Sequence, residues 1–262
     1  MKTRLDAELV RRELARSRES AVELIAAGKV LVNGIPATKA ASQVDAQISI
    51  TLKDDQAEYV SRGGHKLSGA LDHFSTLAIA GKIALDAGAS TGGFTDVLLK
   101  RGAKKVIAAD VGYGQLAWQL QSDDRVKILD RVNVRSITKE QVGEEIDLVV
   151  ADLSFISLKL VLPAFIDVAK DDADFLIMVK PQFEVGKERL GAGGVVRDAI
   201  LRKEAVAAVA ATALKLGFGC LGVVASPLPG PSGNVEYFLW LSKAGQALLE
   251  VDLDLAIEKG PA

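Results

Sequence analysis

Ionisable side chains stand at the end of one apolar stretch after another in the larger part of the sequence. Asp86, Asp110, Asp130, Asp152 and Lys180 each close a short hydrophobic run that is typical of a buried strand. If these strands are parallel, their carboxyl ends meet at one edge of the sheet, where the ligands of such sheets bind. The spacing therefore predicts a rim of four carboxylates and one amine around a binding site.

A glycine-rich loop follows the first of these runs. The segment LDAGASTGGF has three glycines that allow a sharp turn and a close approach to a ligand, with two hydroxyl side chains between them. Its spacing differs from the G-x-G-x-x-G of dinucleotide-binding sheets, which argues against NAD, the alternative ligand. We predict S-adenosylmethionine, with Asp110 on the ribose hydroxyls and Asp130 at the adenine edge. The cofactor-binding residues expected are Asp86, Gly88, Ala89, Ser90, Thr91, Gly92, Gly93, Phe94, Asp110, Val111, Asp130 and Asp152.

Other residues bear on which atom would receive a methyl group. A cytosine C5 methyltransferase needs a cysteine at a strand end, but Cys220 begins a late predicted strand. An amine methyltransferase typically has two prolines after the fourth strand, where this sequence reads DLSF. A ribose hydroxyl is a very weak acid and needs a base, and a lysine can serve if burial or a second cation lowers its pKa. Asp152, Lys180 and Glu236 supply two carboxylates and one such lysine.

The stretch SRGGHKL, residues 61–67, places a second lysine ahead of the first strand. Gly63 and Gly64 are expected to let this segment fold over the rim, so that Lys66 becomes the second cation. The ordered set is then Lys66, Asp152, Lys180 and Glu236. This order is similar to the K-D-K-E tetrad of the FtsJ-like ribose 2′-O-methyltransferases.

The elements that would position these residues alternate between strand and helix. Strands are predicted at 82–88, 105–110, 125–130, 146–152 and 173–180, and helices at 94–103, 114–121, 157–169 and 199–216. Two last strands, CLGVVAS and VEYFLWLS, are joined too briefly for a crossover helix and should form an antiparallel edge hairpin. The expected fold class is α/β, with a Rossmann-like, seven-stranded, mostly parallel doubly wound sheet and a small N-terminal α+β domain.

The first 52 residues have a pattern of their own. Two short helices are expected, the second capped by Ser17 and ended by Gly28, followed by a hairpin with an Asn33-Gly34 turn and a strand at 46–52. Residues 1–53 contain nine basic and six acidic side chains, a charge of +3, while the remainder carries −5. We predict domains at 1–52 and 62–262, joined by the charged linker KDDQAEYVS at 53–61.

The N-terminal segment resembles the S4 RNA-binding domain over roughly residues 4–52, which implies phosphate contacts with structured RNA. The expected RNA-binding residues are Arg4, Arg11, Arg12, Arg16, Arg18, Lys29 and Arg62, and a solvated helix face is the alternative for the arginines of this segment. TRLD, residues 3–6, resembles the catalytic tripeptide of pseudouridine synthases, but its place inside the predicted first helix argues against that activity.

Composition limits the remaining possibilities. The chain has 262 residues, 49% of them hydrophobic, which suffices for a large core beside a small domain. It has one cysteine, no signal-peptide pattern, and a longest apolar run, 205–225, that is broken by Lys215 and three glycines. We read that run as a helix followed by a strand, and predict a cytoplasmic protein without membrane segments. The glycine-rich segment 184–198 is expected to be either a loop that closes on RNA or cofactor or a plain surface loop.

The whole chain, from about residue 4 to 241, resembles the TlyA family, which joins an S4 domain to an FtsJ-like methyltransferase and is sometimes labelled hemolysin A. The motifs are SRGGHKL, LDAGASTGGFTDVLL, ADVGYGQLAW, VVADLSFISL, VKPQFEVGK and SPLPGPSGNVEYFLWL. The resemblance implies 2′-O-methylation of cytidine in 16S and 23S rRNA within 30S and 50S subunits, without a metal, and a link to susceptibility to capreomycin-type antibiotics. The C-terminal tail looks like the longer form of the family, which modifies both subunits.

Roles follow for the tetrad on this hypothesis. Lys180 acts as the base toward the 2′-hydroxyl, Asp152 orients it and faces the methyl sulfonium, and Lys66 with Glu236 positions the ribose; a strand-end cap and a surface charge are the alternatives for Lys180 and Glu236. Two other functions stay open. A membrane-lytic protein would need a secretion or insertion segment, which the sequence lacks. An RNA-binding assembly factor without catalysis would not need the intact tetrad.

Overall fold

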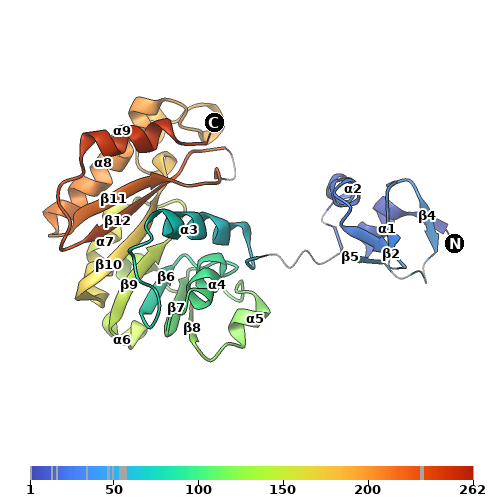
Figure 1. Ribbon diagram of the computed structural model, residues 1–262, viewed down its shortest axis with the longest axis horizontal. Helices are drawn as coiled ribbons and strands as arrows, with labels where there is room; N and C mark the ends of the chain where they lie inside the picture. Colours follow the sequence, from blue (N-terminus) through green and yellow to red (C-terminus); the bar gives the residue numbers. More distant parts are fainter. Residues whose placement is uncertain are drawn as a thin grey trace. The chain divides into compact units, whose positions relative to one another are not determined.

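The chain folds into two compact units, which are described separately. The computed structural model describes residues 2–12, 14–15, 17–33, 35–45, 48, 50–52, 58–230 and 233–261. The smaller unit is Met1–Glu58 and the larger is Tyr59–Ala262 (Figure 1). Residues 53–57 of the predicted linker lie outside the described part, and residues 59–61 belong to the larger unit.

The smaller unit packs two helices on short strands. Its elements are β1 (Lys2–Arg4), α1 (Leu5–Arg11), α2 (Arg18–Ala26), β2 (Val30–Val32), β3 (Ile35–Pro36), β4 (Gln43–Asp45) and β5 (Ile50–Leu52). β1 pairs with β4, and β2 lies between β3 and β5. Ser17 caps α2 as predicted, because its hydroxyl accepts a hydrogen bond from Ser20 N at 3.2 Å. Leu5, Leu9 and Val30 are fully buried in the core of this unit.

Two local predictions for the smaller unit need comment. TRLD lies only partly inside the first helix, because Thr3 and Arg4 belong to β1, whereas Leu5 and Asp6 begin α1. Asn33 has the left-handed backbone that a tight hairpin turn requires, with φ of 50°, whereas Gly34 lies outside the described residues. Of the predicted strand at 46–52, β5 covers the last three residues, and 46, 47 and 49 are outside the described part.

A seven-stranded sheet forms the centre of the larger unit. Its strands are β6 (Ile83–Ala87), β7 (Lys105–Asp110), β8 (Val126–Asp130), β9 (Ile146–Ala151), β10 (Ala169–Val179), β11 (Gly219–Ala225) and β12 (Tyr237–Ser242). Across the sheet they follow the order β11-β12-β10-β9-β6-β7-β8. The strands β6 to β10 are parallel, and β12 is antiparallel to both β10 and β11. The predicted fold class and the antiparallel edge are therefore confirmed.

Helices cover both faces of this sheet (Figure 1). One face carries α3 (Arg62–His73), α4 (Gly93–Lys100) and α5 (Trp118–Gln121), and the other carries α6 (Lys139–Val142), α7 (Leu162–Val168), α8 (Ala199–Lys215) and α9 (Glu250–Glu258). Side chains of successive strand residues point to opposite faces of the sheet, so Ala84 packs with the first set of helices and Leu85 with the second. Within the described residues, no helix combines the length and apolar character needed to span a bilayer.

The stretch SRGGHKL begins a helix that the sequence analysis did not predict. α3 starts at Arg62, with Ser61 at the N-cap position. Its glycines serve close packing, because a Cβ on Gly64 would overlap the Tyr59 ring and one on Gly93 of α4 would lie 2.7 Å from the Gly64 nitrogen. Two adjacent glycines weaken helix propensity, which is why residue preferences alone hide α3.

Several boundaries also differ from those predicted. α5 starts at Trp118 instead of residue 114, because the amides of Gly112 and Gly114 donate to the Asp110 and Asp130 carboxylates and hold 111–117 as a loop. The predicted helix at 157–169 divides into a 3-10 turn, η2 (Leu158–Leu160), and α7, and β10 extends back to Ala169.

Candidate active site

The glycine-rich loop between β6 and α4 is a tight cradle of backbone. Gly88 has φ of +84°, and a Cβ there would lie 2.5 Å from the carbonyl oxygen of Asp152, at the end of β9. Ser90 also has a left-handed backbone, with φ of 48°, and its amide donates to Asp110 at 2.9 Å. The loop therefore leaves no room for side chains where it passes the neighbouring strand, and it exposes backbone to a ligand.

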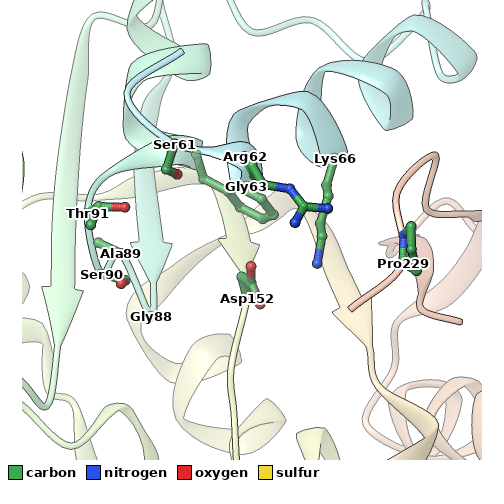
Figure 2. A pocket seen from close by; sticks show the side chains of 12 residues that line it. Ser61, Arg62, Gly63, Lys66, Gly88, Ala89, Ser90, Thr91, Asp152 and Pro229 are labelled. Carbon is green, nitrogen blue, oxygen red and sulfur yellow. The ribbon is translucent and has the colours of Figure 1, made fainter. Parts of the chain in front are cut away.

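A pocket of about 270 Å³ opens beside this loop (Figure 2). It is lined by Ser61, Arg62, Gly63, Lys66, Gly88, Ala89, Ser90, Thr91, Gly93, Phe94, Asp152 and Pro229. Figure 2 shows Lys66 pointing from α3 toward the side of the pocket where Asp152 lies, with Ser90 and Thr91 along the loop. Seven of the predicted cofactor-binding residues line the pocket, namely Gly88, Ala89, Ser90, Thr91, Gly93, Phe94 and Asp152.

The other predicted cofactor residues do not line this pocket. Asp110 and Asp130 are register partners at the ends of β7 and β8, so they share one edge of the sheet. Their carboxylates accept backbone hydrogen bonds, Asp110 from Gly112 at 2.7 Å and Asp130 from Gly114 at 3.1 Å. Val111 is 70% exposed beside them. Gly92, with φ of +93°, precedes α4 and is buried under Leu116 and Leu120.

Asp86 is buried inside the fold, where it bonds to the helix that follows the loop. Its side chain is fully buried, and Oδ2 accepts a hydrogen bond from the Thr95 hydroxyl at 2.7 Å. Oδ1 has no hydrogen-bond partner among the described residues. Burial is the main cause that raises the pKa of Asp86 to about 7.

This pKa gives a stability prediction with a definite sign. The folded protein keeps the Asp86 proton up to a pH of about 7, whereas the unfolded chain releases it near the ordinary pKa of 3.8. The contribution of Asp86 to stability is therefore greatest below the lower pKa and falls as pH rises toward the higher one, by roughly 1.4 kcal/mol per pKa unit of difference. In Asp86→Asn, which cannot ionise, the melting temperature relative to wild type should rise over this window and level off above it. A difference in melting temperature between Asp86→Asn and wild type that stays constant across this pH range would contradict this account.

Four charged side chains from distant parts of the chain meet beside the pocket. Lys66 Nζ lies 2.5 Å from Glu236 Oε2, and Lys180 Nζ lies 2.6 Å from Asp152 Oδ1 and 4.0 Å from Glu236 Oε1. Lys180 also donates to the Ser154 hydroxyl at 3.3 Å. The side chain of Glu236 is fully buried, and those of Lys66 and Lys180 are about nine-tenths buried. The structure thus brings together all four residues of the predicted tetrad.

The hydrogen bonds of this cluster are incomplete. Asp152 Oδ1 and Glu236 Oε1 are buried and accept no hydrogen bond of good geometry from the described residues, although both lie within ion-pair distance of Lys180. Both oxygens therefore retain the capacity to accept a further hydrogen bond.

A second pocket, of about 680 Å³, adjoins the same cluster. It is lined by Ser154, Phe155, Ile156, Ser157, Lys180, Gln182, Phe183, Gly186, Lys187, Leu190, Gly193, Gly194, Asn234 and Glu236. Lys66 and Asp152 line the first pocket, whereas Lys180 and Glu236 line the second. The tetrad therefore stands where the two pockets meet.

Phe155 is a site residue that the sequence analysis missed. It is 91% exposed, its backbone is left-handed with φ of 65°, and its ring centroid lies 5.2 Å from that of Phe183. The residues that follow it are held by Glu184, whose carboxylate accepts from the Ser157 hydroxyl at 2.6 Å and from Leu158 N at 2.7 Å. The available signal was the aromatic residue of DLSF, four residues after the end of β9.

Part of the glycine-rich segment 184–198 forms another wall of the second pocket. Gly186, Lys187, Leu190, Gly193 and Gly194 all line it. Asn234 anchors this segment, because its amide donates to Gly194 O at 3.0 Å and accepts from Val196 N at 2.9 Å. The segment is thus hydrogen-bonded to Asn234, which lies two residues before Glu236 in the chain.

The predicted RNA-binding residues fall in different places. Arg4, Arg11, Arg12 and Arg18 all donate to carboxylates of α1 in the smaller unit. Lys29 stands immediately before β2, and Arg62 begins α3 and lines the first pocket. Arg16 lies outside the described residues. In the described part of the chain, no group of three or more His, Cys, Asp or Glu side chains is arranged to hold a metal ion.

The fold of the larger unit also occurs in a solved structure labelled as an S-adenosylmethionine-dependent methyltransferase. A solved structure from Listeria monocytogenes, labelled as such an enzyme, shares the fold with a TM-score of 0.50 and 17% identity, covering 68% of this chain and 99% of that one. At this identity the likeness concerns the fold alone.

Closer relatives define the family. The FtsJ-like methyltransferase family matches residues 59–243, and the S4 domain matches residues 3–47. The 16S/23S rRNA (cytidine-2′-O)-methyltransferase TlyA of Mycobacterium tuberculosis is 58% identical, and the alignment covers 99% of both chains. A solved structure from Streptococcus thermophilus that carries the label hemolysin is 37% identical, with a TM-score of 0.77 and coverage of 98% and 95%. The chain belongs to the FtsJ-like methyltransferases, within the TlyA family, whose members add an S4 domain.

Proposed function

We propose that this protein is an S-adenosylmethionine-dependent ribose 2′-O-methyltransferase that modifies cytidine in ribosomal RNA. The observation that carries the proposal is the tetrad of two lysines and two carboxylates where the two pockets meet. The name of the Mycobacterium tuberculosis relative supports the substrate class, and its reference to both 16S and 23S rRNA supports action on both subunits. Altered susceptibility to capreomycin-type antibiotics would follow from loss of these methyl groups.

The first pocket fits the methionine part of S-adenosylmethionine. The close approach of Gly88 to the Asp152 carbonyl leaves the loop backbone as the surface that faces the ligand. Asp110 and Asp130 stand at the same sheet edge and would take the ribose hydroxyls and the adenine edge. When bound, the cofactor supplies a methyl group on a positively charged sulfur. Asp152, which lines the pocket, would face that charge.

The chain's own residues would handle the acceptor hydroxyl. A base must lie within reach of the hydroxyl proton that it takes. Lys180 is nine-tenths buried between Asp152 and Glu236 and lines the second pocket, so it is the side chain proposed to take the proton. Asp152 would hold the Lys180 amine in place, and Lys66 with Glu236 would orient the ribose.

The second pocket would hold the target nucleotide. A base that leaves its stack needs a replacement surface, and the exposed ring of Phe155 lies in the same pocket as Lys180 and Glu236. Its strained backbone supports a role outside packing, because left-handed conformations of bulky residues persist where the surroundings impose them.

Phe155→Leu is therefore expected to reduce kcat/KM for rRNA by about tenfold or more, since base stacking on an aromatic ring contributes about 1–3 kcal/mol. Phe155→Trp should retain most of the activity, because it keeps an aromatic face on the same backbone. The measurement is steady-state methylation at several RNA concentrations, with cofactor affinity determined separately. Equal kcat/KM in the leucine variant and wild type would remove Phe155 from the acceptor site.

The proposed reaction is tested by methyl transfer itself. Purified protein is incubated with labelled S-adenosylmethionine and with 30S and 50S subunits from cells that lack the modification. Label recovered as 2′-O-methylcytidine from both particles is the expected result. Intact cofactor binding with no label in either particle would overturn the rRNA assignment and favour an RNA-binding assembly role.

The label hemolysin attached to relatives leads to a simple second test. Hemolysin A of Brachyspira hyodysenteriae is 38% identical to this chain, and the alignment covers 89% of this chain and 97% of that protein. Dye release from liposomes by the purified protein, free of contaminants, is the measurement. Release at low protein concentration would favour a membrane-lytic function, and an absence of release leaves methyl transfer as the only activity under test.

A further inference from the structure

The smaller unit contains a buried carboxylate that joins two arginines from different elements. The Asp6 side chain is 3% exposed, and it stands at the start of α1. Arg4 donates to it through both Nε, at 3.1 Å, and Nη2, at 2.8 Å, while Arg18 of α2 donates through Nη2 at 3.0 Å. The amide of Ala7 also donates to it, at 2.8 Å. Asp6 thus ties the guanidinium groups of two segments to one point.

A second buried carboxylate, Glu8, lies two residues further along α1 and also holds two arginines. The Glu8 side chain is 2% exposed, and both of its oxygens accept from Arg11, at 2.8 and 2.6 Å. Arg12 Nε donates to Glu8 at 2.7 Å, and Arg12 Nη1 continues to the carbonyl of Ile48 at 2.8 Å. These arginines lower the pKa of Glu8 to about 2, and Arg4 above all holds the pKa of Asp6 well below its ordinary value.

The arginines themselves remain largely accessible. The side chains of Arg4, Arg11 and Arg18 are 46%, 61% and 57% exposed. A guanidinium group has five N–H donors in one plane, and Arg4 and Arg11 each use only the edge formed by Nε and Nη2 for the carboxylate. The carboxylates lie on the protein side and the remaining donors belong to exposed side chains. The pairs therefore fix the direction of the guanidinium groups without covering them.

We propose that Asp6 and Glu8 are positioning residues for RNA, which hold Arg4, Arg11 and Arg18 in advance as an oriented set of donors for backbone phosphates. The inference rests on the proposed function, in that it takes the smaller unit to bind rRNA. Long side chains that are already ordered lose less conformational freedom when a phosphate binds. It also gives Asp6, the acidic residue of TRLD, a role other than catalysis.

Net charge and the proposal predict opposite changes in RNA affinity when Asp6 is neutralised. Removing a carboxylate raises the net charge of the smaller unit by one, so simple electrostatics predicts tighter RNA binding and a steeper dependence on salt. Under the proposal, Asp6→Asn binds RNA more weakly by about tenfold, because two arginines must be ordered at the moment of binding. The sign of the change therefore separates the two explanations.

The test is filter binding of the full chain to unmodified, transcribed 23S rRNA at several KCl concentrations. Glu23→Gln is the matched control, because Glu23 is exposed on α2 and its neutralisation makes the same change in charge. The expected result is weaker binding for Asp6→Asn and unchanged or tighter binding for Glu23→Gln. Affinity of Asp6→Asn equal to or above that of Glu23→Gln overturns the inference. Wild-type protein that fails to bind rRNA overturns the proposed function as well.

Two further variants keep the test decisive if Asp6→Asn destabilises the smaller unit. Glu8→Gln must also weaken binding, through Arg11, in protein with an unchanged melting curve. Arg4→Gln must weaken binding in the wild type and have a smaller effect when Asp6→Asn is already present, because the arginine is then no longer oriented. Equal effects of Arg4→Gln in both backgrounds would show that the arginine acts without the carboxylate, which would overturn the inference.

Discussion

Replacing Lys180 with methionine is expected to reduce methyl transfer by roughly a hundredfold to ten-thousandfold, the contribution typical of a positioned acid or base. Methionine keeps the length of the side chain and removes the amine that lies 2.6 Å from Asp152 and 3.3 Å from the Ser154 hydroxyl. Single-turnover methylation of rRNA measures the chemical step directly. Affinity for S-adenosylmethionine, measured by calorimetry, should stay within a few-fold of wild type, because Lys180 lines only the second pocket.

A matched control comes from the opposite end of the sheet. Lys82 stands just before β6 and pairs with Asp174 at 2.6 Å, the same distance as in the Lys180 pair. Lys82→Met therefore removes a comparable ion pair and should leave turnover unchanged. Substantial turnover in Lys180→Met, with cofactor and RNA binding intact, would sink the assignment of Lys180 as the base and point to Asp152 instead.

Glu236→Gln should both destabilise the protein and abolish activity. Glu236 is fully buried, and its charge offsets Lys66 at 2.5 Å and Lys180 at 4.0 Å. Removing one partner of a buried ion pair leaves the other charge without compensation, which costs about 3–5 kcal/mol. The free energy of unfolding, from urea titration, is the measurement, together with methyl transfer on the same preparations.

The double variant with Lys66→Met separates stability from catalysis. Because Glu236→Gln leaves Lys66 uncompensated, removing the lysine as well should recover much of the lost stability, while methyl transfer stays absent. Additive losses of stability in the double variant would mean that the pair does not act as a unit. Recovery of turnover along with stability would show that this pair serves folding alone.

The strands of the larger unit were predictable because each is a nearly continuous apolar run with a charged end. β6, β7 and β9 begin and end within one residue of the predicted limits. Their parallel pairing followed from the helical segments between them, and the short connection before β12 indicated an antiparallel edge. Asp152, Lys180 and Glu236 could be brought together from this topology, since strand ends that share an edge bring distant residues together. Lys66 was placed only by the expectation that residues 61–67 fold over the rim.

What the sequence could not provide are contacts that depend on packing. α3 packs closely against Tyr59 because Gly64 has no Cβ, a tertiary contact with no local signal. The carboxylates of Asp110 and Asp130 were assigned to a ligand, yet they also hold the amides of Gly112 and Gly114. The arginines of the smaller unit looked like isolated positive charges, because no pattern in the sequence shows that the acids between them are buried beneath them.

The position of β12 has a consequence for how the enzyme is made. β12 lies between β10 and β11 and follows both of them in the chain, and Glu236 immediately precedes it. During synthesis, the edge of β10 and the two lysines of the tetrad therefore stay without these partners until β12 has left the exit tunnel. A chain that stops before β12 contains the glycine-rich loop after β6 but lacks Glu236.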